Sequence, residues 1–410
     1  MANSILTPTV IAKEALMQFK NGMGFSANVD KSYSKDFAKK GAKIGTSEKV
    51  RKPNRFTVTN GATYSAQDVT EDSVNLAIDT QKHVGFDFTS SELTLSIDDF
   101  SNRYLAPAAL ALVNQVDVDG LAMAAKNVYN AVGTAATTPS ALLTYLQARQ
   151  KVLESSGPQT DSYSYLINPA ASTTIVDALK GLFQSGDEIS KQYKRGVMGQ
   201  AAGGEWMVSQ SIYQSTSGQR GGTPLVNMAS VTNGTTSLIT DGWTAAAANR
   251  VKAGDVFTIA GVNKCNPITK ADTGVLQQFV VTADASSDGS GNATIVIAPA
   301  IYSSGSLQNV VTAPADNAAL SFTLGGASIG TSAVTAHNLI MHEQSFGLAF
   351  VPLEKPEGVH FSAVETDPDT GISIRIVRDF DFSNDKFRCR MDVAYGWAAL
   401  RPEWACKILG

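Results

Sequence analysis

The chain has 410 residues, 43% apolar and 17% charged, a globular composition with enough material for two or three folding units. It contains no run of about 18 apolar residues and no charged-then-apolar leader, so we expect neither a membrane span nor a secretory signal. Charge is uneven: residues 1–60 hold eleven basic and four acidic residues, a net +7, whereas the whole chain is −4, which leaves −11 for the rest. A basic arm on an acidic body is consistent with nucleic-acid binding, with contact to another acidic copy, or with simple solvation.

The first 45 residues predict an N-terminal arm. Apolar periodicity is weak there and glycines interrupt it, except near Thr9–Lys20, where we expect a short helix. Termini of this kind are usually poorly ordered unless a partner holds them. We therefore expect an otherwise extended arm.

Residues 46–92 predict a long two-stranded β-ribbon. Phe56–Thr59 is rich in β-branched residues and leads into the turn dipeptide Asn60-Gly61, and Val74–Ile78 alternates apolar and polar residues. A lone ribbon is marginally stable in water. A ribbon of this length needs a surface to lie on, which another subunit would provide.

Helices and strands alternate in the next stretch. A helical stripe predicts a long helix from Arg103 to Tyr129, roughly 40 Å at about 1.5 Å per residue. A cap signal predicts a second helix over Ser140–Glu154. A strand at Tyr163–Ile167 and a helix at Ala171–Phe183 follow, so this stretch predicts an α+β body.

Residues 226–332 have a different composition. They contain ten charged residues in 107, about half the density of the whole chain, and are rich in Gly, Ala, Ser, Thr and Asn. Short strands separated by turn signals predict a small all-β barrel or sandwich, inserted between two α+β stretches. The predicted strands are Val256–Ala260, Phe279–Thr282, Ala293–Ile297, Val310–Thr312 and Leu320–Leu324, and beyond the insert Ile372–Val377, Phe387–Val393 and Arg401–Ala405.

Motifs that carry chemistry are almost absent. The three cysteines and four histidines are too scattered for a disulfide framework or a metal site, so the cysteines predict small core residues in a reducing compartment. Gly326–Gly330 matches G-x-S-x-G, but no convincing helix follows Ser328 to build a nucleophile elbow. Asp288–Asn292 and Asp367–Gly371 predict turns rather than cation sites. We expect no enzyme, no catalytic residue, no metal and no cofactor.

Three motifs carry a resemblance to a known family. Val251–Val262 is similar to a strand-turn-strand with a basic residue, Gly-Asp and Ala-Gly-Val; Ile167-Asn168-Pro169 is similar to Phe-Asn-Pro; and Ala394–Glu403 is similar to Tyr-Gly-x-x-x-x-Arg-Pro-Glu. In this order they resemble the major capsid proteins of tailed phages with the HK97-type fold, and among these the coat proteins of the P22 type from short-tailed phages, which carry an inserted β-domain. The resemblance covers roughly residues 95–410, and the first 90 residues share only its layout.

The resemblance implies an α+β tailed-phage capsid fold. Its parts would be an N-terminal arm (1–45), an extended β-ribbon or E-loop (46–92), a peripheral domain with the spine helix (93–135), the first part of the central or axial domain (136–225), an inserted β-barrel domain (226–332), and strands of the central and peripheral domains (333–410). The stretch Val226–Arg250 is short for the long loop that reaches between neighbouring capsomers in that family.

The resemblance also implies a function. The protein would be a major capsid protein that self-assembles through pentamers and hexamers into an icosahedral shell around phage double-stranded DNA. Implied partners are further copies of itself, a separate scaffolding protein for procapsid assembly, a portal protein, and packaged DNA touched without sequence specificity. It would be made and assembled in the host bacterial cytoplasm and end in the virion capsid, with no membrane partner.

For inter-subunit contacts we expect the basic end of the ribbon to meet acids on the next copy. The candidate residues are Arg51, Lys52 and Arg55 on the ribbon and Asp98, Asp99 and Glu354 on its neighbour. Exposed pairs contribute about 0–1 kcal/mol each, so they would set register more than strength.

Other functions remain open at this point. An encapsulin-like bacterial compartment shares the core fold. A secreted β-rich adhesin explains the Ser/Thr/Gly-rich middle but predicts an export signal. A nucleic-acid-binding protein predicts a basic body with interleaved aromatic residues, and a hydrolase predicts a coherent catalytic cluster.

Overall fold

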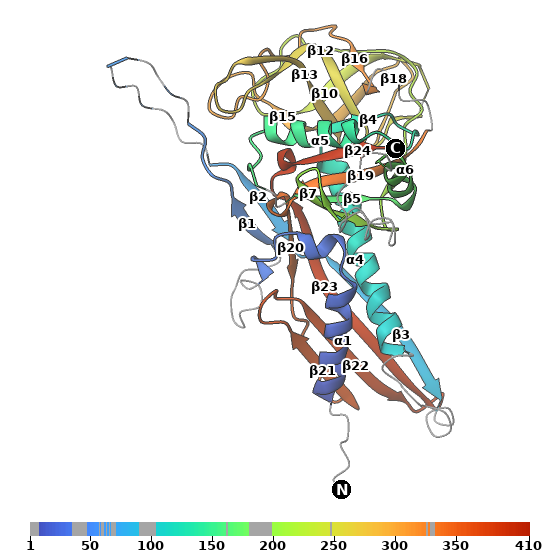
Figure 1. Cartoon of the computed structure of the whole chain (residues 1–410). Coiled ribbons are helices and arrows are strands. Elements are labelled where there is room, and N and C mark those ends of the chain that lie inside the picture. The colour runs from blue at the N-terminus through green and yellow to red at the C-terminus, as the bar shows by residue number, and fades with distance from the viewer. Residues whose placement is uncertain are drawn as a thin grey trace. The chain divides into compact units, whose positions relative to one another are not determined.

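The computed structural model describes residues 8–34, 47–56, 58, 61–62, 64, 66, 71–89, 104–160, 163–179, 199–246, 248–324, 327–328 and 333–410 (Figure 1). The chain forms two compact units. Unit 1 consists of Met1–Val50, Ser73–Gly120 and Phe346–Leu400, and unit 2 of Arg51–Asp72, Leu121–Ser345 and Arg401–Gly410. Each unit is therefore assembled from three separate stretches of sequence.

Unit 1 is built on an antiparallel sheet in the order β20-β23-β22-β21, with β3 paired to β23. On β23, Cys389, Met391 and Val393 are buried, whereas the alternate residues Arg388 and Arg390 are exposed, so one face of the strand is core and the other polar. The strands are β3 Thr80–Thr89, β20 Phe346–Phe350, β21 Phe361–Thr366, β22 Ser373–Asp381 and β23 Lys386–Ala399.

The described part of the N-terminal arm folds onto unit 1. The predicted helix is confirmed as α1, Pro8–Gly22, which lies along β21 and β22 (Figure 1). After it, the short 3-10 helix η1, Phe25–Asn28, is held by the buried Asp117, whose carboxylate accepts the backbone N–H groups of Gly24, Phe25 and Ser26 at 3.0, 3.1 and 2.9 Å. A buried carboxylate with three such donors is a strong anchor. Residues 8–34 are thus part of the subunit core rather than a free extended arm.

The predicted long helix is confirmed as α4, Ala106–Asn127, and the division between the units falls within it. By length and composition it is the one described helix that could cross a membrane, but 56% of that window is buried, as in the core helix of a globular protein. Gly120 gives it a close approach: an added Cβ would lie 2.5 Å from the Trp397 ring and 2.8 Å from the Phe25 ring, and these two rings stack with centroids 5.2 Å apart.

Unit 2 contains a sheet in the order β4-β24-β19-β5-β7-β6, with β8 paired to β19. Its core is aromatic, because the Tyr165 and Trp206 rings stack at 4.5 Å and Tyr145 packs on Trp206 at 4.9 Å. Helices α5, Leu142–Glu154, and α6, Pro169–Leu179, accompany it. The strands are β4 Ala131–Gly133, β5 Tyr163–Ile167, β6 Gln200–Ala201, β7 Gly204–Val208, β8 Gln214–Thr216, β19 Val334–His342 and β24 Ala405–Leu409.

The predicted strand at Arg401–Ala405 is wrong. Pro402–Trp404 forms the 3-10 helix η4, and strand β24 begins only at Ala405. Proline fixes φ and lacks an N–H, so it suits the start of a helical turn and interrupts a strand. The predicted strand at Phe56–Thr59 also fails where the structure describes it, because neither Phe56 nor Val58 is in a strand.

The inserted β-domain lies within unit 2 and has its own core of buried side chains, among them Leu238, Phe257, Phe279 and Ile295. Its sheet runs β16-β12-β13-β15-β10-β9. The edge strands meet through a bridge between Leu225 and Ala319, so the sheet nearly closes into a barrel. The strands are β9 Gly222–Val226, β10 Thr235–Trp243, β12 Val256–Cys265, β13 Asp272–Val281, β15 Ala293–Ile301 and β16 Leu320–Ser321, with the small pairs β11 Asn249–Val251 with β14 Ala285–Ser286 and β17 Thr323–Leu324 with β18 Ala327–Ser328.

Two smaller expectations are settled within the insert. The segment predicted as a strand at Val310–Thr312 contributes one isolated bridge, Lys264 to Val310. Asp288–Asn292 is a turn, because the Asp288 carboxylate accepts the N–H groups of Ser290 and Asn292, both at 2.8 Å. Of the G-x-S-x-G match, Ala327 and Ser328 form β18, and its glycines lie outside the described residues.

Replacing Gly120 with alanine tests the close packing in unit 1. Alanine gains roughly 1 kcal/mol in helix propensity, but the new methyl group must displace two stacked rings, and overpacking costs about 1–3 kcal/mol. We expect a net loss of unfolding free energy, read as a lower urea midpoint. Gly289→Ala, where an added Cβ meets nothing within 4 Å, is the control and should leave the midpoint unchanged; equal midpoints for the two variants would contradict the packing argument.

Candidate assembly surfaces and their anchors

The predicted β-ribbon has a short paired stem. Strands β1, Ser47–Arg51, and β2, Ser73–Ala77, form a two-stranded sheet and lie side by side in Figure 1. Val50 and Leu76 are buried in a small apolar cluster, and the backbone N–H of Lys52 donates to the Asp72 carbonyl at 2.8 Å. The regular ladder therefore ends near Lys52, and residues 53–70, which we call the ribbon loop, lie beyond it.

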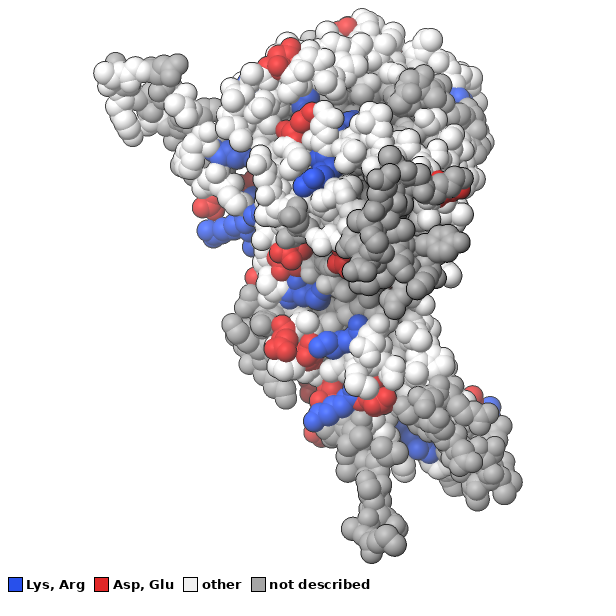
Figure 2. Space-filling view, viewed as in Figure 1, with Lys and Arg blue, Asp and Glu red and all other residues white. Residues whose placement is uncertain are grey.

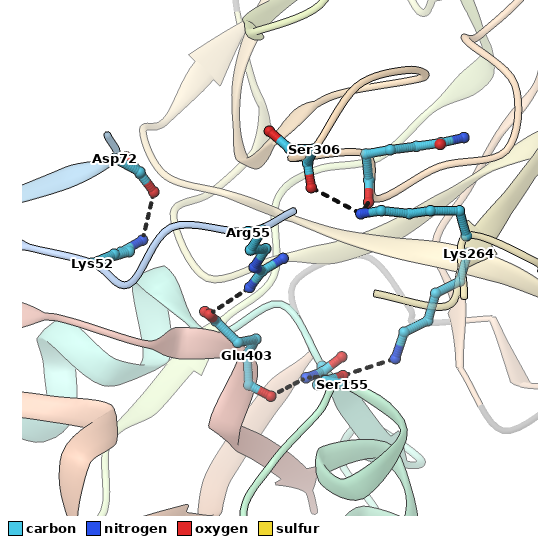
Figure 3. A network of polar contacts seen from close by, with 10 residues as sticks. Lys52, Arg55, Asp72, Ser155, Lys264, Ser306 and Glu403 are labelled. Atoms are coloured by element: carbon cyan, nitrogen blue, oxygen red, sulfur yellow. Dashed lines mark hydrogen bonds and ion pairs between the residues drawn. The ribbon is translucent and has the colours of Figure 1, made fainter. Parts of the chain in front are cut away.

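Each predicted cation of the ribbon has an acidic partner in its own chain. Arg51 Nη1 lies 3.4 Å from Glu71 Oε2, and Lys52 Nζ lies 3.1 Å from Asp72 Oδ2, so two ion pairs cross the end of the stem. Arg55 Nη2 lies 3.3 Å from Glu403 Oε1 (Figure 3). Contacts of these cations with a second copy remain a prediction.

The structure describes one of the three acids predicted to meet the ribbon cations. Glu354 is exposed, and its backbone carbonyl accepts a hydrogen bond from Arg375 Nη1 at 2.9 Å. Asp98 and Asp99 lie outside the described residues. Among the three predicted acids, Glu354 is thus the one that the structure describes, and the hydrogen bond that it accepts comes from Arg375 rather than from a ribbon cation.

The ribbon loop carries exposed apolar side chains that the sequence reasoning did not select. Phe56 is 64% exposed, Val58 94% and Tyr64 88%. Isolated exposed apolar residues are ordinary, but three large ones on one short segment indicate an interaction surface. The available signal was their alternation with polar residues, which was used only to predict a strand.

The backbone around Glu403 is held in place by contacts of its neighbours. The Arg401 backbone N–H donates to the Ser345 carbonyl at 3.0 Å, the Arg401 guanidinium lies 4.3 Å from the centre of the Trp404 ring, and Asn130 Nδ2 donates to the Glu403 carbonyl at 3.1 Å. The same asparagine faces Ser155, which accepts from Lys264 Nζ at 2.8 Å (Figure 3). The Arg-Pro-Glu motif thus builds a rigid turn that presents one carboxylate to the ribbon loop.

A buried lysine joins three segments of unit 2. Lys407, on β24, is fully buried, and its Nζ donates to the carbonyls of Ala125 on α4 and Gly254 in the insert, both at 2.9 Å. Burial lowers the pKa of Lys407 to about 7, although Asp255 and Cys406 act in the opposite direction. Gly254 has φ +100°, a backbone conformation that favours glycine.

The Gly-Asp motif next to this lysine completes the junction. The Asp255 carboxylate accepts the Lys252 N–H at 3.0 Å and pairs with Arg220 at 2.8 Å. Deeper in the insert, the Gln278 side chain accepts the N–H of Ala131 at 2.9 Å and donates to its carbonyl at 3.0 Å, as a neighbouring strand would. The insert is therefore fixed to β4 and β24 by hydrogen bonds as well as by apolar packing.

Surface charge over the insert is sparse. In Figure 2 the surface above β10, β12 and β13 is mostly uncharged, in line with its composition. Among the residues that the structure describes, no cluster of histidine, cysteine or acidic side chains could hold a metal ion. The three cysteines are buried and unpaired, as predicted from the sequence.

Comparison with known proteins identifies the family. The family model described as P22 coat protein, gene protein 5, matches residues 1–410. The chain belongs to this family. It is therefore the major capsid protein of a tailed phage, a structural and non-enzymatic protein of the virion whose copies form an icosahedral shell. This assignment decides against the adhesin and encapsulin alternatives.

Solved structures with similar folds are distant in sequence. A protein of Mycobacterium phage Che8 is 11% identical, with 94% of this chain and 90% of that chain covered and a TM-score of 0.45. The capsid of Cyanophage P-SCSP1u is 12% identical, with 89% of this chain and 83% of that chain covered and a TM-score of 0.43. The virus-like particle from Pyrococcus furiosus is 11% identical, with 97% of each chain covered and a TM-score of 0.37. Among curated proteins, none matches the chain by sequence. The family assignment rests on the full-length family match.

One arrangement in this coat protein resembles part of a catalytic site. Ser215 Oγ lies 2.6 Å from Nε2 of His337, but Nδ1 of this histidine has no hydrogen-bond partner. Burial, and then the charge of Lys407, lowers the pKa of His337 well below its usual value, which makes it a poor base. Without an orienting acid, the pair lacks the third member of a triad. Its role is structural, between β8 and β19.

The buried Lys407 predicts a pH dependence of stability. Its pKa of about 7 in the folded coat protein lies below the ordinary 10.5, so between these values the unfolded chain binds more protons. The unfolding free energy should therefore rise with pH above about 7, by up to about 2 kcal/mol between pH 7 and pH 9 for one group. In Lys407→Met this part of the rise should be missing.

Urea unfolding of unassembled subunits at pH 7, 8 and 9 measures this rise. Lys126→Met, which removes an exposed lysine next to the acceptor residue Ala125 on helix α4, is the matched control. If the unfolding free energy rose equally with pH in Lys407→Met and in the unsubstituted protein, the rise could not be assigned to Lys407.

Proposed function

We propose that this coat protein assembles through pentamers and hexamers, with a scaffolding protein and around a portal protein, into a procapsid that receives phage double-stranded DNA. The full-length family match carries the proposal. A closed shell needs one subunit to make many repeated, heterologous contacts. Weak individual contacts allow errors to be corrected, and their sum makes the shell stable.

The ribbon is the element that we assign to the neighbouring copy. Its stem is short, and its loop exposes Phe56, Val58 and Tyr64, which would gain most by burial on another subunit. The basic residues at the end of the stem would then set register against acids of that copy, with Asp98, Asp99 and Glu354 as the candidates. The six sequence segments defined above, from the arm to the terminal strands, serve as the functional divisions in this proposal.

The charge distribution supports enclosure of DNA without tight binding. Residues 61–410 carry a net −11, so the body would repel phosphates and leave packaged DNA free to slide. A separate scaffolding protein is proposed by analogy with the family. Both assembly and synthesis would take place in the host bacterial cytoplasm.

Electron microscopy of the coat protein expressed alone and with its scaffolding protein tests the proposal. We expect closed shells of uniform size in the presence of scaffolding protein. Strictly monomeric protein under both conditions, including at high concentration, would overturn it. Packaged DNA in particles from infected cells would establish the contents.

A charge-exchange series separates the two roles of the ribbon cations. Arg51→Glu with Lys52→Glu should abolish normal shells, because the change removes any contact with acids of a neighbour and also places like charges across the stem. Adding Glu71→Lys and Asp72→Lys restores opposite charges within the stem but leaves the outer surface inverted.

If the cations contact a second copy, the fourfold variant should still fail to assemble in electron microscopy. Normal shells from the fourfold variant would show that these residues act only within the stem. Circular dichroism and the urea midpoint of the subunit serve as folding controls for both variants.

A further inference from the structure

The ribbon loop is tied to the rest of unit 2 at Arg55. Within the described part of residues 53–70, this is the one residue with an ion pair or hydrogen bond to another segment, and its partner is Glu403. The Glu403 side chain is only 15% exposed, whereas that of Arg55 is 38% exposed. A fixed, largely buried carboxylate therefore holds a cation that solvent, or another protein, can still reach.

A second cation, Lys270, weakens the ion pair between Arg55 and Glu403. Lys270 Nζ donates to the carbonyls of Ser306 and Gln308 at 2.9 and 3.3 Å. Burial lowers the pKa of Lys270, Cys265 acts in the opposite direction, and the positive charge of Arg55 again lowers it, which places the two cations within electrostatic reach. Repulsion from Lys270 offsets part of the attraction of Glu403, so the pair holds the loop without locking it.

We propose that Arg55 and Glu403 form a latch that holds the base of the ribbon loop, at Arg55, on its own subunit before assembly, and that the latch opens when an acidic group of a second copy takes Arg55. This inference rests on the proposed function of the ribbon as an inter-subunit strap. In a free subunit Glu403 is always close by, so it outcompetes acids in solution. Inside a growing shell, the neighbour's acid is equally close. Burial of the apolar loop residues on the neighbour then favours transfer of Arg55 from Glu403 to that acid.

The latch predicts opposite effects of removing its two halves. Glu403→Gln frees Arg55 while leaving it able to bind a neighbour, so the critical concentration for scaffold-assisted assembly should fall by about 3- to 10-fold, the range of a partly exposed ion pair. Arg55→Gln removes the latch and the contact with the neighbour together, so the critical concentration should rise. A purely structural ion pair would give changes in the same direction for both.

The critical concentration is measured by light scattering at fixed scaffolding protein, and hydrogen exchange of residues 53–70 is measured in the unassembled subunit. Exchange should be faster in both variants than in the unsubstituted protein, because both release the loop. Glu403→Ala is a second variant in case the glutamine still accepts from Arg55. Glu71→Gln is the matched control, because it removes one acid of the ribbon that does not contact Arg55, and it should leave exchange of the loop unchanged.

Two results would overturn the latch: a shift of the critical concentration in the same direction for Glu403→Gln and Arg55→Gln, or unchanged hydrogen exchange of the loop in Glu403→Gln and Glu403→Ala. Failure of the proposed function looks different, because the unsubstituted protein would then form no closed shells with scaffolding protein. The exchange measurement on free subunits tests the latch in that case as well.

Discussion

The buried amine of Lys407 is the constraint on which unit 2 depends. One Nζ donates to a carbonyl of α4 and a carbonyl of the insert, and the lysine itself lies on β24 between β4 and β19. A buried amine without such acceptors would cost several kcal/mol, so the two carbonyls allow Lys407 to be buried where the three segments meet. The Gly-Asp turn of the insert belongs to this junction, because Gly254, with φ +100°, presents its carbonyl to this amine.

Much of the fold could be predicted from sequence because it depends on local patterns. Periodicity predicts α4 and a cap signal predicts α5 to within a few residues, and the predicted strand Tyr163–Ile167 has the observed bounds of β5. Low charge density and frequent turn signals were enough to recognise the inserted β-domain. These features depend on nearest neighbours along the chain, which is the information that a single sequence carries.

The rest could not be predicted because distant residues decide it. Nothing near Asp117 in sequence indicates that it holds the arm residues Gly24, Phe25 and Ser26. Likewise, the sequence predicts contact of Arg55 with acids of a second copy, which stays a prediction, whereas its partner in the same chain, Glu403, lies 348 positions away in the Arg-Pro-Glu motif. The pattern Arg401–Ala405 looks extended, yet proline and the packing of Arg401 on Trp404 turn it into a 3-10 helix.

The ladder between β3 and β23 has a consequence for how subunits are produced. It pairs Thr80 with Tyr395 and Thr89 with Lys386, about 300 positions apart, so unit 1 cannot close its sheet until a very large loop has been closed. The strands of the insert are separated by far fewer residues and can pair early. Until β3 and β23 have paired, their strand edges stay exposed and can aggregate with other chains. Substitutions that delay formation of this ladder should therefore reduce the number of subunits that reach the folded state. The subunits that do fold should form shells of unchanged stability.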